Sequence, residues 1–507
     1  MVDFGKFPEI EFPDTDFALI ATSYVHEDGN KELAAAGGRE VIRSTMRPYI
    51  GMVRFNPAFV PFSPRNLTDF DNNFFITVLH EYTHALGFTN SLFKYFHPIN
   101  STTPYGKGAL CSFKKYGKNF TFLVTPYSHI YAKKRFGVDT FYGDNGKKCP
   151  AGIELEDYGS SSTAGSHLEK RVYNSEIMVG DDVLTKIPYF KYSDATLSVL
   201  MDTGFYKINW ANAQPLVFGH PESIDGKPIK DFAIEPPQKS FPENYLFTNN
   251  NSVGFDFRSI TNYNMNVLED SIDCDNTKYQ PYCSDARYKF YNPNKLHIIS
   301  RDVLADYQLT IHPEYYCWNN TAILPGKLID APEYTEPDAL KFENLCGTFK
   351  CNNYESFDFT ILDANGKTIT MKCSKNNINE EFNQTLKAHY NNTDYIITKT
   401  NICPDPERFC RTMKLSYMNF NKDPFDPNTK VLEGDPQKPP EWIFDYSGLD
   451  DELKQVKQRF AIVFGVVCSI IVIVGVLIAI RFYFKKIKRR KHSQQSDIDE
   501  EYLVNNT

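Results

Sequence analysis

The run His80-Glu81-Tyr82-Thr83-His84 constrains this chain more than any other feature of its sequence. In an α-helix, two histidines four residues apart lie one turn apart on the same face, so both imidazoles can bind one metal ion. Glu81 can lie beside the open metal position and take a proton from a water bound there. The apolar approach at 72–79 and the helix-stopping Gly87 favour this interpretation over an amphipathic helix with two partly buried histidines.

A catalytic zinc ion usually has three protein ligands, so a third ligand must come from elsewhere in the chain. Asn90 occupies the position, six residues after His84, where many metzincins carry their third histidine. The downstream candidates are His97, His129 and His167. A packed or surface role is the simpler explanation for His97, which lies beside a proline in an aromatic-rich stretch. His129 has no neighbouring residues that suggest metal binding.

His167 differs from these two because Met178 follows it in the same region of the chain. A methionine in a tight turn beneath three zinc-binding histidines is the Met-turn of the metzincins, where the thioether packs below the imidazoles without binding the metal. Alone, Met178 would be an ordinary core residue. Together with the helical pair, it predicts a zinc site formed by His80, His84 and His167 above Met178.

Four stretches together resemble the leishmanolysin family, surface zinc endopeptidases of the metzincin clan. They are residues 80–88 (HEYTHALGF), residues 165–171 and 176–178 (GSHLEKR and EIM), and residues 197–206 (LSVLMDTGFY). The long insertion between the second and third ligands is the family's own departure from the short metzincin motif. The resemblance covers roughly residues 15–410 and is looser in the part rich in cysteine.

This resemblance implies an α+β fold. We expect a metzincin-type zinc protease catalytic domain, a Cys-rich, β-rich C-terminal region and a single C-terminal transmembrane helix. The resemblance also implies one Zn²⁺ per chain, Glu81 as the general base, and protein or peptide substrates. The alternative is a catalytically impaired cell-surface adhesion or binding protein that retains the protease fold. Nothing in the metal motif favours such a loss, because the three histidines, Glu81 and Met178 are all present.

Composition argues against nucleic acid as a partner. The net charge is −8, and the sequence has neither a Gly-rich phosphate loop nor a patch of interleaved basic and aromatic residues.

Residues 460–480 form an uninterrupted run of apolar or small residues whose length matches a membrane-spanning helix. The alternative is a buried core helix, but such a helix would contain strongly polar residues, which this run lacks. The flank at 481–491 is strongly basic, whereas the flank at 450–459 mixes both signs. The positive-inside rule therefore predicts a single-pass protein with a cytoplasmic C-terminal tail and the rest of the chain outside the cell or in a lumen.

Ten of the eleven cysteines precede this run, and an even number fits five disulfides formed in an oxidising compartment. We expect Cys111 and Cys149 to pair within the insertion. Seven N-x-S/T sequons before the apolar run are compatible with a glycoprotein; they begin at Asn66, Asn100, Asn119, Asn250, Asn319, Asn383 and Asn391.

The N-terminus lacks the apolar core of a signal peptide. We interpret this as a truncated gene model that is missing the signal peptide and the pro-segment. The alternative is that the C-terminal span alone targets the chain, which would leave residues 1–459 in the cytosol with reduced cysteines.

Segments 17–25 and 49–55 read as strands. The second could be the edge strand that pairs with extended substrate in metzincins, and the alternative is an ordinary internal strand. The predicted organisation has seven parts: an N-terminal catalytic subdomain at 1–90, an insertion at 91–163, a third-His and Met-turn subdomain at 164–215, a Cys-rich domain at 216–415, a Pro-rich stalk at 416–459, the span at 460–480 and the tail at 481–507.

Overall fold

The structure is a computed structural model, and its chain divides into two compact units, residues 1–444 and 445–507. All the residues that it describes lie in the first unit: 14–24, 32–60, 73–144, 146–159, 163–180, 190–242, 245, 253–260, 271–291, 297–308, 315–317, 321–329, 341–390, 392–420 and 422–426.

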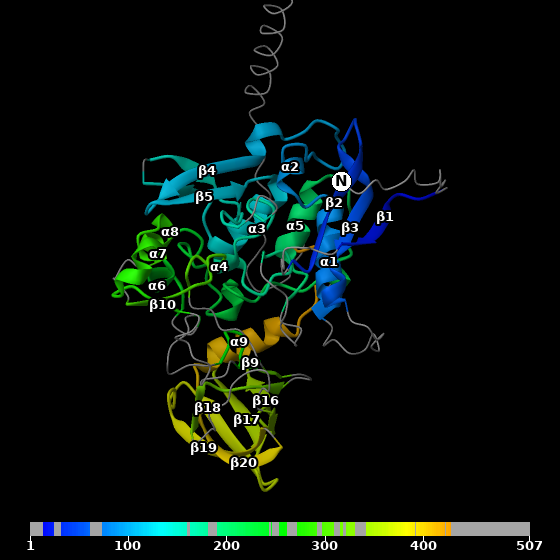
Figure 1. The fold of residues 1–507 in the computed structure, drawn as a ribbon. Coiled ribbons are helices and arrows are strands. Elements are labelled where there is room, and N and C mark those ends of the chain that lie inside the picture. Colours follow the sequence, from blue (N-terminus) through cyan, green and yellow to red (C-terminus); the bar gives the residue numbers. More distant parts are fainter. Residues whose placement is uncertain are drawn as a thin grey trace, which may run out of the picture. The chain divides into compact units, whose positions relative to one another are not determined.

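A three-stranded sheet and one helix form the N-terminal part (Figure 1). The strands are β1 (Ala18–Ser23), β2 (Ala34–Ile42) and β3 (Arg47–Phe55), in the order β1-β3-β2, with β1 parallel and β2 antiparallel to β3. Helix α1 (Asn73–Ala85) carries the HExxH motif. It packs closely on the sheet, because a Cβ placed on Gly51 of β3 would lie 2.9 Å from that of Ala85.

The prediction of an edge strand at 49–55 is wrong. The strand exists as part of β3, but it is the centre of its sheet and is hydrogen-bonded on both sides. The edge next to α1 is β2, whose sequence AAAGGREVI is too poor in β-branched and aromatic residues to read as a strand.

The middle of the chain packs short helices and strands around an aromatic core that includes Phe88, Phe120 and Phe122. β4 (Leu110–Lys115), β5 (Lys118–Leu123) and β8 (Ile153–Glu154) form one sheet, and β6 (Thr140–Tyr142) pairs with β7 (Lys148–Pro150). The helices here are α2 (Asn90–Phe93), α3 (Pro126–Phe136), α4 (Lys170–Tyr173), α5 (Asp194–Asp202) and α6 (Pro237–Ser240).

Shorter elements complete this part of the molecule. Two strand pairs are β9 (Ser259–Ile260) with β12 (Tyr315–Tyr316) and β10 (Ser271–Asp273) with β11 (Ile298–Ser300). The helices α7 (Gln280–Cys283) and α8 (Ala286–Tyr291) lie between them in sequence. The described 3₁₀ turns are η1 (Pro57–Phe59), η2 (Gly106–Ala109), η3 (Trp210–Asn212), η4 (Pro221–Ser223) and η6 (Thr277–Tyr279).

The described strands between residues 321 and 402 form two four-stranded sheets that share a second hydrophobic core. One has the order β13 (Thr321–Ala322), β16 (Gly347–Asn352), β17 (Ser356–Leu362), β18 (Thr368–Ser374). The other has the order β14 (Gly326–Ile329), β20 (Thr393–Ile402), β19 (Glu381–Tyr390), β15 (Lys341–Glu343). Helix α9 (Pro406–Ser416) adds Phe409 to this core, with its ring 4.0 Å from that of Phe357.

The ten predicted disulfide cysteines form five bonds, as expected, including the predicted one between Cys111 and Cys149. The other four are Cys274–Cys283, Cys317–Cys346, Cys351–Cys410 and Cys373–Cys403. Such bonds stabilise the fold mainly by restricting the unfolded chain.

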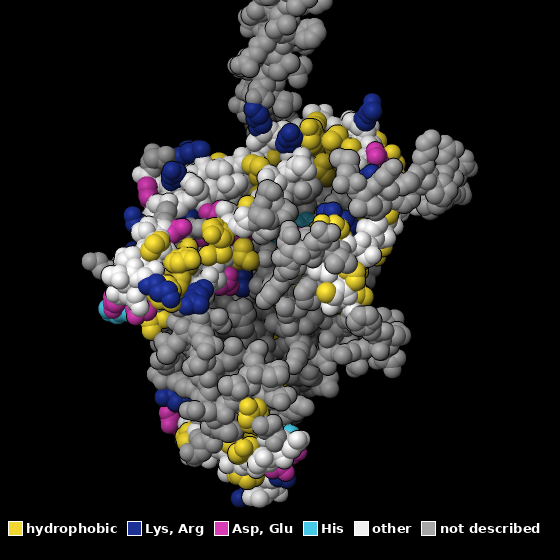
Figure 2. Space-filling view, in the orientation of Figure 1, with side chains coloured by type: hydrophobic (Ala, Val, Ile, Leu, Met, Phe, Trp, Pro, Cys, Tyr) yellow, Lys and Arg dark blue, Asp and Glu magenta, His cyan; other side chains and the backbone are white. Residues whose placement is uncertain are grey.

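Among the described residues, no helix combines the length and the apolar character needed to cross a bilayer. The span predicted at 460–480, the tail at 481–507 and most of the stalk lie outside those residues, so they stay predictions, as do the domain boundaries. On the face drawn in Figure 2, basic and acidic side chains are intermixed over the described part of the surface, with hydrophobic side chains between them.

Candidate metal centre

Three histidines from two distant segments meet at one point. The Nε2 atoms of His80, His84 and His167 lie 3.1 Å from one another in all three pairs. The two histidines of α1 stand on one face of the helix, as their spacing requires. His167 comes from the loop that precedes α4, and all three side chains are buried.

The other ring nitrogen of each histidine contacts a main-chain carbonyl. His80 Nδ1 lies 2.6 Å from the oxygen of Ile177, His84 Nδ1 lies 2.7 Å from that of Phe88, and His167 Nδ1 lies 3.0 Å from that of Thr163. A carbonyl oxygen only accepts hydrogen bonds, so each Nδ1 carries the proton and donates it. Each Nε2 therefore keeps its lone pair, and three acceptors face one another with no hydrogen between them.

Burial also keeps these rings neutral. It is the largest cause that lowers the pKa of His80, and it places the pKa of His84 well below its usual value. The pKa of His167 falls to about 3, first through burial and then through the nearby His80. Neutral imidazoles are the form that binds metal ions.

The end of α1 explains how the Phe88 carbonyl reaches His84. The Phe88 N–H donates to the Thr83 carbonyl and the Gly87 N–H donates to the His84 carbonyl, which is the Schellman arrangement of a helix C-terminus. Gly87 has a φ of +122°, a value that side chains disfavour. The chain therefore turns back on itself, and the carbonyl of Phe88 meets the ring of His84.

A tight turn at residues 176–179 holds Met178. The Val179 N–H donates to the Glu176 carbonyl at 3.4 Å, which makes Ile177 and Met178 the central residues, and Met178 is fully buried. Because the Ile177 carbonyl accepts from His80, this turn also orients a candidate ligand. The Leu168 N–H donates to the Met178 carbonyl at 2.8 Å, which ties the turn to the His167 segment.

The carboxylate of Glu176 stabilises this turn from inside. It accepts hydrogen bonds from the Met178 N–H at 2.6 Å and from the Ser193 N–H and hydroxyl at 3.1 and 3.0 Å. Sequence reasoning assigned Glu176 no role. An acidic residue two positions before a methionine in a turn is the only signal the sequence offers for it.

Glu81 is buried beside His80, and its Oε2 has no hydrogen-bond partner among the described residues. Burial is the main cause that raises the pKa of Glu81 to about 8, and the negative charge of Glu32 adds to it. Glu32 lies two residues before β2, so this strand begins near the carboxylate.

The other sequence candidates lie outside the centre. His129 is buried and its Nδ1 lies 2.5 Å from the Ala151 carbonyl, while His97 packs against the ring of Phe205. Asn90 lies close to the third histidine even so, because its N–H donates to the Ser166 hydroxyl at 3.2 Å. It supports the loop that carries His167.

The three Nε2 atoms fit a zinc ion. The centre of a triangle with sides of 3.1 Å lies about 1.8 Å from each corner, so an ion just off its plane can make three Zn–N bonds of about 2.0–2.1 Å. The three Nε2 atoms are neutral acceptors with no donor between them, so a cation is the simplest partner for them. The donor set is thus that of a catalytic zinc site with three protein ligands.

Fold and centre together define the class of this protein: an α+β protein of the metzincin type. The sequence model of leishmanolysin matches residues 7–254. This part of the chain therefore resembles the leishmanolysin family, a family of zinc metalloendopeptidases.

Named relatives agree with this assignment. The chain is 30% identical over 220 residues to a leishmanolysin homolog of Crithidia fasciculata, which covers 42% of this chain and 29% of the relative. It is 27% identical over 237 residues to a leishmanolysin-like peptidase of Caenorhabditis elegans, covering 41% and 33%. Leishmanolysin of Leishmania major is 28% identical over 210 residues, covering 41% and 29%. The chain thus matches about a third of the length of these relatives.

Proposed function

We propose that this protein is a membrane-anchored, zinc-dependent endopeptidase. The observation that carries the proposal is the set of three buried Nε2 atoms, each 3.1 Å from the other two, with every Nδ1 held by a main-chain carbonyl. We assign His80, His84 and His167 as ligands of one zinc ion per chain.

When bound, zinc would polarise the scissile carbonyl and lower the pKa of water at this site. Glu81 would take the proton from the attacking water on its free Oε2 and pass it to the leaving amine. Burial raises the pKa of Glu81 to about 8, and a divalent cation bound nearby would lower it again, towards the range in which a general base works.

We propose the outer edge of β2 as the strand that pairs with an extended peptide substrate. β2 is an edge strand of the described sheet, it packs against α1, and it begins two residues after Glu32, which acts electrostatically on Glu81. Its small side chains allow a second backbone to approach, and no atom lies within 4 Å of the Cβ position of Gly37.

The proposed anchor is the apolar run at 460–480, with the tail at 481–507 in the cytoplasm and the catalytic part outside the cell or in a lumen. Five disulfides support an oxidising compartment for residues 111–410. The described sequons at Asn100, Asn119 and Asn383 are exposed, which supports glycosylation.

The test uses the full chain and its Glu81→Ala variant, with zinc content and cleavage of an unstructured protein measured for both. We expect the variant to keep one zinc ion and to lose about 10²–10⁴-fold in activity, the share that general acid–base catalysis contributes. Glu355→Ala is the matched control, because Glu355 is exposed and pairs with Lys375 at the surface.

Cleavage at the wild-type rate by Glu81→Ala would disprove the role of Glu81. A wild-type chain that holds zinc tightly and cleaves nothing would instead favour the adhesion or binding protein.

A further inference from the structure

Seven charged side chains are packed together next to the segment that carries His167, and we call them the buried charge cluster. Six are almost completely buried, and Asp157 keeps 19% of its side chain exposed. Five are acidic and two are basic: Glu154, Glu156, Asp157, Glu169, Asp306, Lys118 and Arg171. If all are ionised, the cluster has a net charge of −3. Buried charge of one sign is costly unless it is compensated.

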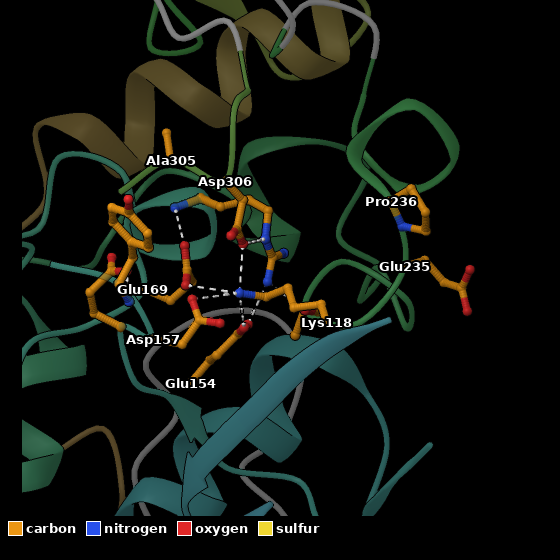
Figure 3. Close-up of polar contacts among 12 residues, drawn as sticks. Lys118, Glu154, Asp157, Glu169, Glu235, Pro236, Ala305 and Asp306 are labelled. Carbon is orange, nitrogen blue, oxygen red and sulfur yellow. Dashed lines mark hydrogen bonds and ion pairs between the residues drawn. The ribbon is translucent and has the colours of Figure 1, made fainter. Parts of the chain in front are cut away.

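The two basic side chains, Lys118 and Arg171, neutralise part of the negative charge of the cluster. Figure 3 shows four carboxylates directed at the ammonium of Lys118. That ammonium lies 2.8 Å from Asp306, 3.1 Å from Asp157, 3.4 Å from Glu169 and 3.7 Å from Glu154. The Arg171 guanidinium also pairs with Glu154 at 2.6 Å and with Asp306 at 3.0 Å. Glu154 and Asp306 are therefore each paired with two cations.

Glu156 has no such partner among the described residues. It is 2% exposed, its Oε1 accepts from the Tyr158 N–H, and its buried Oε2 has no hydrogen-bond partner in the described part of the chain. Carboxylate oxygens of Glu156, Asp157 and Glu169 lie within 4.8 Å of one another. Lys118 reaches one oxygen each of Asp157 and Glu169 but makes no ion pair with Glu156 among those described.

We propose that Glu156, Asp157 and Glu169 form a calcium site, separate from the three-histidine centre. Ca²⁺ takes six to eight oxygen ligands at about 2.3–2.6 Å, so two ligands on opposite sides of the ion lie about 4.8 Å apart. An all-oxygen donor set selects a hard cation over zinc. The partly exposed Asp157 leaves a route for the ion and for the water molecules that complete its coordination.

The position of the site gives it a structural consequence. The Glu156 N–H donates to the His167 carbonyl at 3.0 Å, and the Gly165 N–H donates to the Glu156 carbonyl at 2.7 Å. Glu156 therefore holds the loop at the third histidine and two residues before it. A cation bound to its carboxylate fixes that loop and stabilises the arrangement in which His167 meets the other two histidines.

The test measures Ca²⁺ binding to the zinc-loaded full chain by calorimetry and by the thermal unfolding midpoint, without substrate. We expect one Ca²⁺ per chain, a higher midpoint, and an affinity above that for Mg²⁺. Glu156→Gln should weaken Ca²⁺ binding about tenfold or more while zinc stays bound. Glu235→Gln is the matched control, because Glu235 pairs with Lys115 and points away from the cluster in Figure 3.

No Ca²⁺ binding by the wild type, tighter binding of Mg²⁺, or unchanged Ca²⁺ affinity in Glu156→Gln would overturn the proposal. Absence of Ca²⁺ binding would mean that protonation of the carboxylates, and not a cation, neutralises the cluster. If Glu156→Gln does not fold, Asp157→Asn tests the same site at its exposed edge. Since no readout uses cleavage, failure here leaves the peptidase proposal standing, and an inactive peptidase leaves this one standing.

Discussion

Each candidate zinc ligand is oriented by main chain and not by another side chain. The acceptors are the carbonyls of Ile177, Phe88 and Thr163, and all three rings expose Nε2 to the same point. Substitution cannot remove a carbonyl, so the orientation depends on the backbone path of three loops. Single side-chain changes at the ligands should therefore separate metal binding from folding.

Replacing His167 should remove the metal. We expect His167→Ala to fold but to lose stoichiometric zinc and all measurable cleavage, since two imidazoles remain where a catalytic zinc usually has three protein ligands. Zinc content and circular dichroism check this. His129→Ala is a control within the same fold, and zinc retained in equal amount by His167→Ala would exclude His167 as a ligand.

Glu176 should act as a positioning residue for the turn at 176–179. Glu176→Gln replaces one acceptor oxygen by an amide that cannot accept, which leaves a buried N–H or hydroxyl unpaired. We expect a loss of about 1–3 kcal/mol in unfolding free energy and about tenfold or more in zinc affinity. Equal zinc affinity in the variant would show that the turn keeps the Ile177 carbonyl in place without this carboxylate.

At the scale of elements, α1 and the loop before α4 supply the three histidines, and the turn at 176–179 orients His80. The helix could be predicted from the sequence, because the HExxH spacing indicates which face carries the histidines and Gly87 indicates where the helix ends. β2 could not, because strand formation by AAAGGREVI depends on pairing with β3 and packing on α1, and small residues carry little preference of their own.

Gly87→Ala should weaken the metal centre although Gly87 is not one of its ligands. A side chain at a φ of +122° strains the helix end, so we expect a loss of roughly 1–3 kcal/mol in unfolding free energy and weaker zinc binding as the Phe88 carbonyl shifts. Gly108→Ala is the matched control, because no atom lies within 4 Å of its Cβ position and its φ is ordinary. Similar stability of the two variants would contradict this role of Gly87.

The β-rich region has a buried lysine that predicts a pH dependence. Lys399 on β20 donates to the Leu324 carbonyl and to Asn401, and burial lowers its pKa to about 7. In the unfolded chain its pKa is about 10.4, so between these values the unfolded state binds more protons. Unfolding free energy should therefore gain up to about 1.4 kcal/mol per pH unit from this group as pH rises from 7 to 9. Chemical denaturation of wild type and Lys399→Met should differ in this slope, and parallel curves would refute the prediction.

At the scale of the whole molecule, the metal would link parts of the chain that are far apart. His84 and His167 are separated by 83 residues, and the ion would join α1 to the loop before α4. Removing zinc with a zinc-selective chelator should lower the thermal midpoint and abolish cleavage, and added zinc should restore both. A midpoint that does not change on chelation would mean that the packing of α1 on its sheet holds the centre by itself.

Local patterns in the sequence determined which residue types could make this site. A helix places positions four apart on one face whatever surrounds it, ten cysteines in an oxidising compartment can pair completely, and an apolar run of bilayer length predicts an anchor. Only the tertiary structure decided the rest: which strand forms the edge beside Glu81, which carbonyls orient the three rings, and which of the five clustered carboxyl groups lacks an ion pair among the described residues. These depend on backbone and charge brought together from distant segments, and no local spacing in the sequence encodes them.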